Sequence, residues 1–133
     1  MADILPPHPG LLPYYLLLTG SLALTHSVVC YTRPLTSMRQ YSGPSAPPPS
    51  ALLSHVYAVQ NVYTGFIRIL AAYDIENQAL YRLAILSFAG VLFLNGSELM
   101  IWKTARLHEI KFALGPSALG LVWLITQREW YTA

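Results

Sequence analysis

The sequence predicts an all-α membrane protein, built as a four-transmembrane-helix bundle. Two observations carry this prediction. Hydrophobic residues make up 54% of the chain and charged residues only 11%, whereas soluble domains carry about 25% charged residues. In addition, no Asp, Glu, Lys or Arg occurs between Ile4 and Thr32, and about 20 largely apolar residues are enough to cross a bilayer as a helix. We therefore expect residues 1–133 to form a single integral membrane domain.

Four apolar segments carry the predicted spans, at approximately residues 11–31, 52–73, 81–102 and 112–127. The last is the shortest, because a helix of its 16 residues reaches about 24 Å, slightly less than the roughly 27 Å of a thin bilayer. The first span lacks a preceding basic region and follows a proline-rich start, so we expect a retained signal anchor instead of a cleaved signal peptide.

The segment 32–50 separates the first two spans and contains the run Pro47-Pro48-Pro49. Consecutive prolines favour an extended, solvated backbone, so we expect a loop in water. Small residues recur at helical spacing in two spans, where they would let another helix approach closely. These residues are Gly20, Ala23 and Ser27 in the first span and Ala113, Ser117 and Gly120 in the fourth.

The second span is the most polar. Tyr57, Asn61, Thr64 and Arg68 recur at spacings of four, three and four residues, which places them on one stripe of a helix. Polar groups facing lipid would lack partners, so the stripe is expected to face protein. Arg68 is about one turn from the polar turn 74–78 and could also extend along its own methylenes to that turn.

The sequence also suggests an ion pair between the second and third spans. If they form an antiparallel hairpin about Glu76, residues lie level when their numbers sum to about 153, by the equal rise of the two helices. Glu98 is then level with His55, and Arg68 with Ile85. A shared proton or an ion pair between Glu98 and His55 would lower the cost of burying both. The alternative is that Glu98 reaches the water of the headgroup region.

Basic residues predict the orientation in the membrane. The two longer loops carry five of them, whereas the other side has only Arg82 and Arg128. The positive-inside rule therefore places these loops in the cytoplasm and both termini in the lumen. The five are Arg33, Arg39, Lys103, Arg106 and Lys111.

No catalytic, metal-binding or nucleotide-binding motif is present in the sequence. The four histidines are far apart, Cys30 is the single cysteine, and no GxGxxG, P-loop or GxSxG pattern occurs, so we expect no metal and no cofactor. A net charge of +2 with scattered basic residues argues against nucleic acid. One arrangement could support catalysis: His55, Glu98 and Asn61 could move a proton on a sterol, as a small isomerase would require. Helix association is the competing interpretation, and a small carrier or channel is a third.

The middle of the chain resembles a known family. The residues that carry the resemblance are the run from Tyr63 to Tyr73, then Asn77, Leu80-Tyr81 and the segment from Phe93 to Leu99. Their order and spacing are similar to the "R-x-x-A-A-Y … N … x-Y … E-L" pattern of the ergosterol biosynthetic protein 28 family. The likeness extends from about Leu22 to Tyr131 and suggests a filamentous-fungal member.

This resemblance implies a multi-pass protein of the endoplasmic reticulum membrane without catalysis of its own. The family acts as a scaffold for sterol C-4 demethylation in ergosterol biosynthesis. The implied partners are the sterol C-4 methyl oxidase, the 3β-hydroxysteroid dehydrogenase/decarboxylase and the 3-keto sterol reductase, with a sterol C-24 methyltransferase as a further neighbour. The residues expected to serve helix association or partner binding are His55, Asn61, Thr64, Arg68, Tyr73, Asn77, Tyr81, Asn95 and Glu98.

The chain departs from the family pattern at the start of the second span. There the family commonly reads A-R-T-F-G-x-W-T, and residues 54–61 of this chain read SHVYAVQN. His55 thus replaces an arginine, which would turn a permanent ion pair with Glu98 into one that depends on pH.

Overall fold

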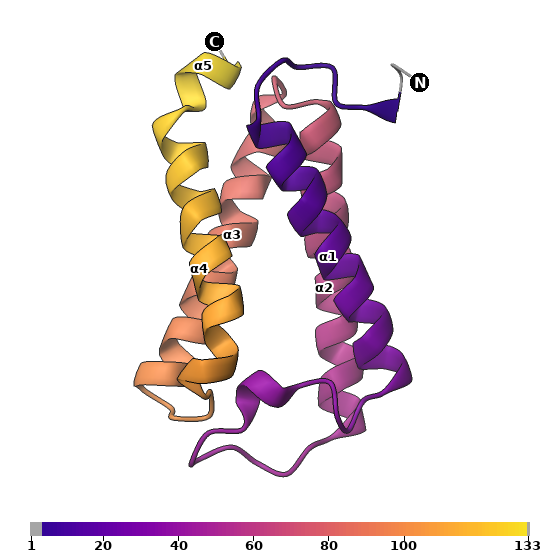
Figure 1. Ribbon diagram of the computed structural model, residues 1–133, viewed down its shortest axis with the longest axis vertical. Helices are drawn as coiled ribbons and strands as arrows, with labels where there is room; N and C mark the ends of the chain where they lie inside the picture. Colours follow the sequence, from indigo (N-terminus) through magenta and orange to yellow (C-terminus); the bar gives the residue numbers. More distant parts are fainter. Residues whose placement is uncertain (1–3, 133) are drawn as a thin grey trace.

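The computed structural model describes residues 4–132, and these residues are all helical or irregular. Figure 1 shows two antiparallel helical pairs, α1 with α2 and α3 with α4, joined at one end and separated towards the other. The long helices are α1 (Leu12–Thr32), α2 (Ala51–Tyr73), α3 (Gln78–Met100) and α4 (Leu107–Thr126). Two short elements, the 3-10 helix η2 (Arg39–Tyr41) and α5 (Arg128–Thr132), complete the fold.

Local sequence signals set the ends of α2 and α3. The Ser50 hydroxyl accepts a hydrogen bond from the amide of Leu53, and the Asn77 side chain accepts from the amides of Ala79 and Leu80. Serine and asparagine are favoured at this position because they satisfy amides that have no partner within the helix. Asn77 thus fixes the turn between α2 and α3, where the two helical pairs meet.

The α1–α2 contact confirms the predicted use of small residues in the first span. A Cβ atom added to Gly20 would lie 2.8 Å from the carbonyl oxygen of Gly65, and one added to Gly65 would lie 2.9 Å from that of Gly20. The two backbones therefore approach as closely as only glycine allows. In the other pair, Gly120 of α4 faces the Phe88 ring of α3, which an added Cβ would meet at 2.7 Å.

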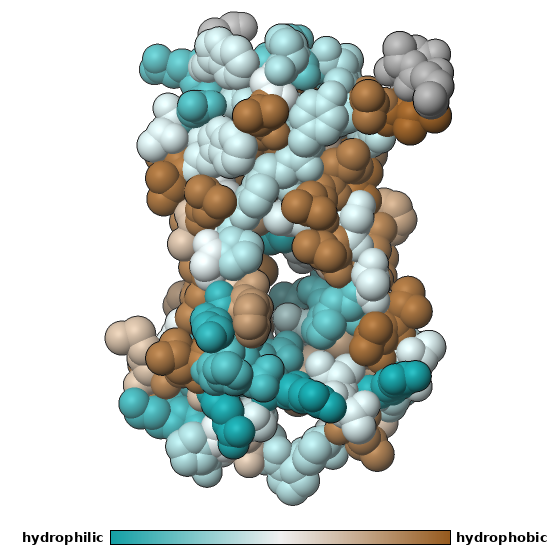
Figure 2. Space-filling view, in the orientation of Figure 1, coloured by the Kyte–Doolittle hydropathy of each residue, from teal (hydrophilic) through white to brown (hydrophobic). Residues whose placement is uncertain are grey.

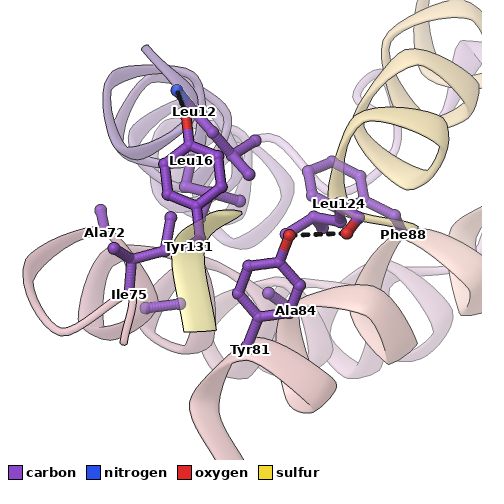
Figure 3. Packing of buried hydrophobic residues seen from close by; sticks show 10 residues of the cluster. Leu12, Leu16, Ala72, Ile75, Tyr81, Ala84, Phe88, Leu124 and Tyr131 are labelled. Atoms are coloured by element: carbon purple, nitrogen blue, oxygen red, sulfur yellow. Dashed lines mark hydrogen bonds between the residues drawn. The ribbon is translucent and has the colours of Figure 1, made fainter. Parts of the chain in front are cut away.

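The apolar core lies at the end of the molecule where the two pairs meet (Figure 3). The hydroxyl groups of two buried tyrosines form hydrogen bonds that link its helices. The amide of Leu12 donates to the Tyr131 hydroxyl at 3.2 Å, and the Tyr81 hydroxyl donates to the carbonyl of Leu124 at 2.6 Å. The core consists of Leu12, Leu16, Ala71, Ala72, Ile75, Tyr81, Ala84, Phe88, Leu124 and Tyr131. It therefore joins all four long helices and α5 at one end of the bundle.

Many large apolar side chains are exposed along the helices, and Figure 2 shows them on one face, with hydrophilic residues gathered towards the lower end. Three helices, α1, α3 and α4, are long and apolar enough to cross a membrane. α2 is 23 residues long but is not among these three, because its polar stripe lowers its hydropathy. The structure thus supports a helical membrane protein, whereas the fourth crossing stays a prediction.

The predicted spans match the helices with shifts of a few residues, except the fourth. α4 begins at Leu107, not at residue 112, and so has 20 residues. Residues 107–111 were expected to belong to the loop of residues 103–111, which is the most charged segment of the chain. They are helical because Ile110 is fully buried, so burial of one face outweighs the charge on the other. At 1.5 Å per residue α4 reaches about 30 Å, enough to cross a bilayer.

Residues 32–50 were predicted to form an extended loop in water, and the extended conformation was wrong, because the segment contains the 3-10 helix η2. α1 ends at Thr32, so the segment is here called the 33–50 connection. It folds back across the end at which the two helical pairs are separated, the open end (Figure 1). The amides of Gly43 and Ser45 donate to the carbonyls of Thr104 and Lys103, and the amide of Arg106 donates to the carbonyl of Gln40. The connection between α1 and α2 is therefore hydrogen-bonded to the connection between α3 and α4. The two longer loops therefore lie at the same end of the molecule, whereas their cytoplasmic placement stays a prediction.

Candidate functional site: polar contacts between the helices

The predicted polar stripe of α2 faces other helices. Asn61 Nδ2 lies 3.1 Å from His26 Nδ1 of α1, so the amide can donate to the unprotonated imidazole nitrogen. The Tyr57 ring meets the same imidazole edge-on, with centroids 5.8 Å apart. Thr64 is half-buried on this stripe. Polar side chains thus reinforce the α1–α2 pair beside the Gly20–Gly65 contact.

Arg68 links α2 to α3 instead of extending to the polar turn, so that alternative was wrong. Its Nε donates to the Ser87 hydroxyl at 3.0 Å, and its Nη2 lies 3.5 Å from the Ser87 carbonyl oxygen. The guanidinium carbon is 3.8 Å from the centroid of the Phe88 ring, a cation–π contact. The side chain is only 6% exposed, and no carboxylate of residues 4–132 is among the ionisable groups that act on it. Arg68 is therefore a buried cation held by a hydroxyl, a carbonyl and an aromatic face.

Tyr41 of the 33–50 connection lies between the two helical pairs. Its hydroxyl donates to Asn95 Oδ1 of α3 at 2.6 Å, and its ring meets Tyr57 of α2 with centroids 6.1 Å apart. Asn95 is 1% exposed, so Tyr41 satisfies a buried acceptor that would otherwise face hydrocarbon. Burial raises the pKa of the Tyr41 hydroxyl above its usual value, and nearby Tyr57 and Glu98 add to the rise. The hydroxyl is therefore protonated, and a donor, across the physiological pH range.

The predicted pair between His55 and Glu98 does not form. The His55 ring stacks on Tyr31 of α1, with centroids 4.4 Å apart, and a Glu98 carboxylate oxygen accepts a hydrogen bond from the Thr104 hydroxyl. The reason is that α2 and α3 separate from the turn at Asn77 onwards, so residues level with each other near the other end no longer touch. Tyr41 occupies the space between them.

The remaining predicted residues make hydrogen bonds at the end of the molecule where the turn between α2 and α3 lies. The Tyr73 hydroxyl donates to the carbonyl of Ile4 at 2.6 Å. Asn77 caps α3 and also donates to the Asp74 carboxylate at 3.1 Å. Tyr81, 1% exposed, donates to Leu124 across the α3–α4 pair. These three residues hold elements of one chain together.

The chemistry of this arrangement is that of helix association. The predicted residues form separate contacts along the bundle and are not gathered around one pocket. No group of three or more His, Cys, Asp or Glu side chains that could hold a metal occurs within residues 4–132. The His55–Glu98 pair that an isomerase would use is also not assembled. What the contacts do is hold two helical pairs and their connections in one arrangement.

Sequence reasoning missed several partners in these contacts. Tyr41 and Ser87 were not singled out, although Tyr41 stands between apolar Met38 and a glycine in a segment expected to be solvated. Apolar and aromatic residues inside a loop are the available signal that it packs on protein. Phe88 also carried a signal, because it lies three residues from the position predicted to be level with Arg68.

Comparison with known proteins agrees with the resemblance. Residues 12–122 match the family described as Erg28 like protein. The "Ergosterol biosynthetic protein 28" of Saccharomyces cerevisiae is 29% identical over 126 residues, which cover 92% of this chain and 84% of that protein. The protein of the same name from Candida albicans is 29% identical over 134 residues, covering 97% and 94%. No solved structure matches the chain significantly.

The family match spans the four long helices almost completely, from the first residue of α1 to within four residues of the end of α4. It includes the glycine contact, the Arg68 contact and the Tyr41–Asn95 hydrogen bond. The chain belongs to the Erg28-like protein family.

Proposed function

We propose that this chain is a non-catalytic scaffold of the endoplasmic reticulum membrane in ergosterol biosynthesis. It would tether the sterol C-4 methyl oxidase, the 3β-hydroxysteroid dehydrogenase/decarboxylase and the 3-keto sterol reductase, with the C-24 methyltransferase nearby. Both curated relatives are named for ergosterol biosynthesis. The observation that carries the proposal is that the polar side chains of the helices are used in contacts with one another instead of forming an acid–base pair.

All four long helices cross the membrane in this proposal. α1 and α3 are apolar enough to span. The C-terminal end of α1 and the N-terminal end of α3 lie at opposite ends of the bundle, and α2 connects them along its full length (Figure 1). If α1 and α3 cross, α2 must cross as well. Its polar stripe is compatible with this because it faces α1, α3 and the 33–50 connection.

The outer face of the α1–α2 pair is the surface we assign to a partner helix. A shallow groove of ≈510 Å³ lies there, and Gln60 and Tyr63 are exposed in it. An amide facing lipid lacks a hydrogen-bonding partner, which a polar side chain of another transmembrane helix would supply. The groove is lined by Tyr31, His55, Val56, Val59, Gln60 and Tyr63.

Affinity purification in mild detergent, followed by mass spectrometry, tests the scaffold. We expect the demethylation enzymes to be recovered with the wild-type chain and several-fold less with Gln60→Leu. Phe93→Leu is the matched control, because Phe93 is an apolar side chain that is 79% exposed on α3, and it should leave recovery unchanged.

Two results would contradict the proposal. One is sterol turnover by the purified chain with no other protein present. The other is a Glu98→Gln variant that stops sterol processing in cells while enzyme recovery stays at the wild-type level. Either result would favour a sterol-acting enzyme over a tether, because a scaffold affects sterols only through its partners.

A further inference from the structure

Arg68 has hydrogen-bonding capacity that the protein does not use. Its guanidinium offers five N–H donors in a planar fork, and the Ser87 contacts involve only Nε and Nη2. No fully buried side-chain nitrogen or oxygen within residues 4–132 lacks a hydrogen-bonding partner. Since Nη1 makes no hydrogen bond, it must reach the accessible part of the side chain, which is the remaining 6%.

The charge of Arg68 is not neutralised either. A cation inside a membrane protein is costly unless an anion or several dipoles compensate it. The ionisable groups that act on Arg68 are the tyrosines Tyr15 and Tyr57, which are neutral near pH 7. Because no carboxylate of residues 4–132 pairs with it, the site lacks one negative charge.

The position of Arg68 suits a membrane-soluble anion. It lies five residues before the end of α2, about 7.5 Å along the helix axis. Figure 2 shows an opening between the two helical pairs at mid-height, with hydrophilic residues beside it. On the side of α3 the guanidinium is covered by the Phe88 ring, which stacks with Tyr15 at 6.2 Å. Phe88 is fully buried, so it closes this side of the guanidinium and leaves the free Nη1 edge as the accessible one.

From this geometry we infer that Arg68 is a binding site for the carboxylate of a sterol acid. The carboxylate would accept hydrogen bonds from the free edge of the guanidinium, and the rings would lie between the helical pairs. A charged pair of this kind is stronger than a neutral hydrogen bond and adds geometric specificity. A carboxylate side chain of a partner helix is the poorer fit, because a helix is about 10 Å across, wider than a flat ring system, and Arg68 is only 6% exposed.

The anion site rests on the geometry alone, whereas its occupant rests on the proposed function. A methyl oxidase that hands its product to a decarboxylase must pass on a carboxylic acid, since decarboxylation removes a carboxylate. A scaffold that tethers these two enzymes would therefore hold the one charged intermediate between them. Sterol alcohols and ketones lack that charge, so the site would distinguish the acid from both.

Binding to the full-length chain in neutral lipid nanodiscs tests this inference. The probes are a sterol 4-carboxylic acid and the matched 4-hydroxymethyl sterol. We expect the wild type to bind the acid roughly tenfold or more tightly than the alcohol. Arg68→Gln should remove the preference, and Arg68→Lys should keep part of it because the charge remains and the fork is lost. Unchanged binding of the neutral sterol shows that a variant is folded.

Three results would overturn the inference. They are equal binding of acid and alcohol by the wild type, a preference that persists in Arg68→Gln, and displacement of the acid by phosphatidic acid at equal concentration, which would assign the site to a phospholipid headgroup. Enzyme recovery with Arg68→Gln separates this inference from the scaffold. Recovery at the wild-type level with the acid preference lost supports a ligand site distinct from the tether. Loss of recovery by this variant with the acid preference intact would assign Arg68 to the partner interface instead.

Discussion

Gly65→Ala is expected to destabilise the protein by about 1–3 kcal/mol, the usual cost of overpacking a tight contact. The added methyl group would lie 2.8 Å from Leu24 Cγ and 2.9 Å from the carbonyl oxygen of Gly20. A backbone oxygen cannot move aside as a side chain can, so α1 and α2 must separate. The measurement is thermal unfolding of the detergent-purified chain, in which Gly20→Ala should show the same loss.

Gly96→Ala is the matched control for this prediction. Gly96 also lies within a helix, but nothing occupies the space within 4 Å of an added Cβ. Alanine is the better helix former by up to about 1 kcal/mol, so this variant should be as stable as the wild type or slightly more stable. If Gly65→Ala unfolded at the temperature of Gly96→Ala, the close approach of α1 and α2 would be wrong.

Tyr41→Phe is expected to release the 33–50 connection from the open end of the bundle. The change leaves the Asn95 amide oxygen buried without its donor, at a cost of about 1–3 kcal/mol. We expect trypsin to cut faster at Arg39, which is exposed and lies two residues before Tyr41. Tyr14→Phe is the control, because Tyr14 is 41% exposed on α1. Equal rates of cleavage in the two variants would contradict a role for Tyr41 in holding the connection.

The same contact predicts a pH dependence. Because burial raises the pKa of the Tyr41 hydroxyl, the folded state holds this proton at a pH where the unfolded state has lost it. Its contribution to stability is therefore complete below about pH 10, the ordinary tyrosine value, and declines as pH rises further. Tyr41→Phe should lack that part of the decline when unfolding is measured from pH 8 to 11.

Much of the fold follows from local patterns in the sequence. The uncharged segment before Thr32 predicted α1. The spacing of small residues around Gly20 and Gly120 identified helix faces that do pack closely against neighbouring helices. The count along the hairpin placed Arg68 level with residue 85, and its partner is Ser87. These predictions succeeded because helical rise and periodicity are regular over short distances.

The contacts near the open end could not be predicted in the same way. The hairpin count assumes that α2 and α3 stay side by side, and the insertion of Tyr41 makes that assumption fail for His55 and Glu98. The composition of residues 32–50 indicates how the backbone is solvated, but it does not indicate what the segment folds against. Such tertiary contacts depend on elements that are distant in the sequence, so local rules do not reach them.

The tether itself is tested most directly by the proximity of two of its proposed partners in native membranes. Cross-linking between the C-4 methyl oxidase and the 3-keto reductase would be measured in cells with and without this chain. We predict that removing the chain lowers the cross-linking yield to that of an unrelated endoplasmic reticulum protein, while the amount of each enzyme stays the same. An unchanged yield in cells that lack the chain would contradict the account.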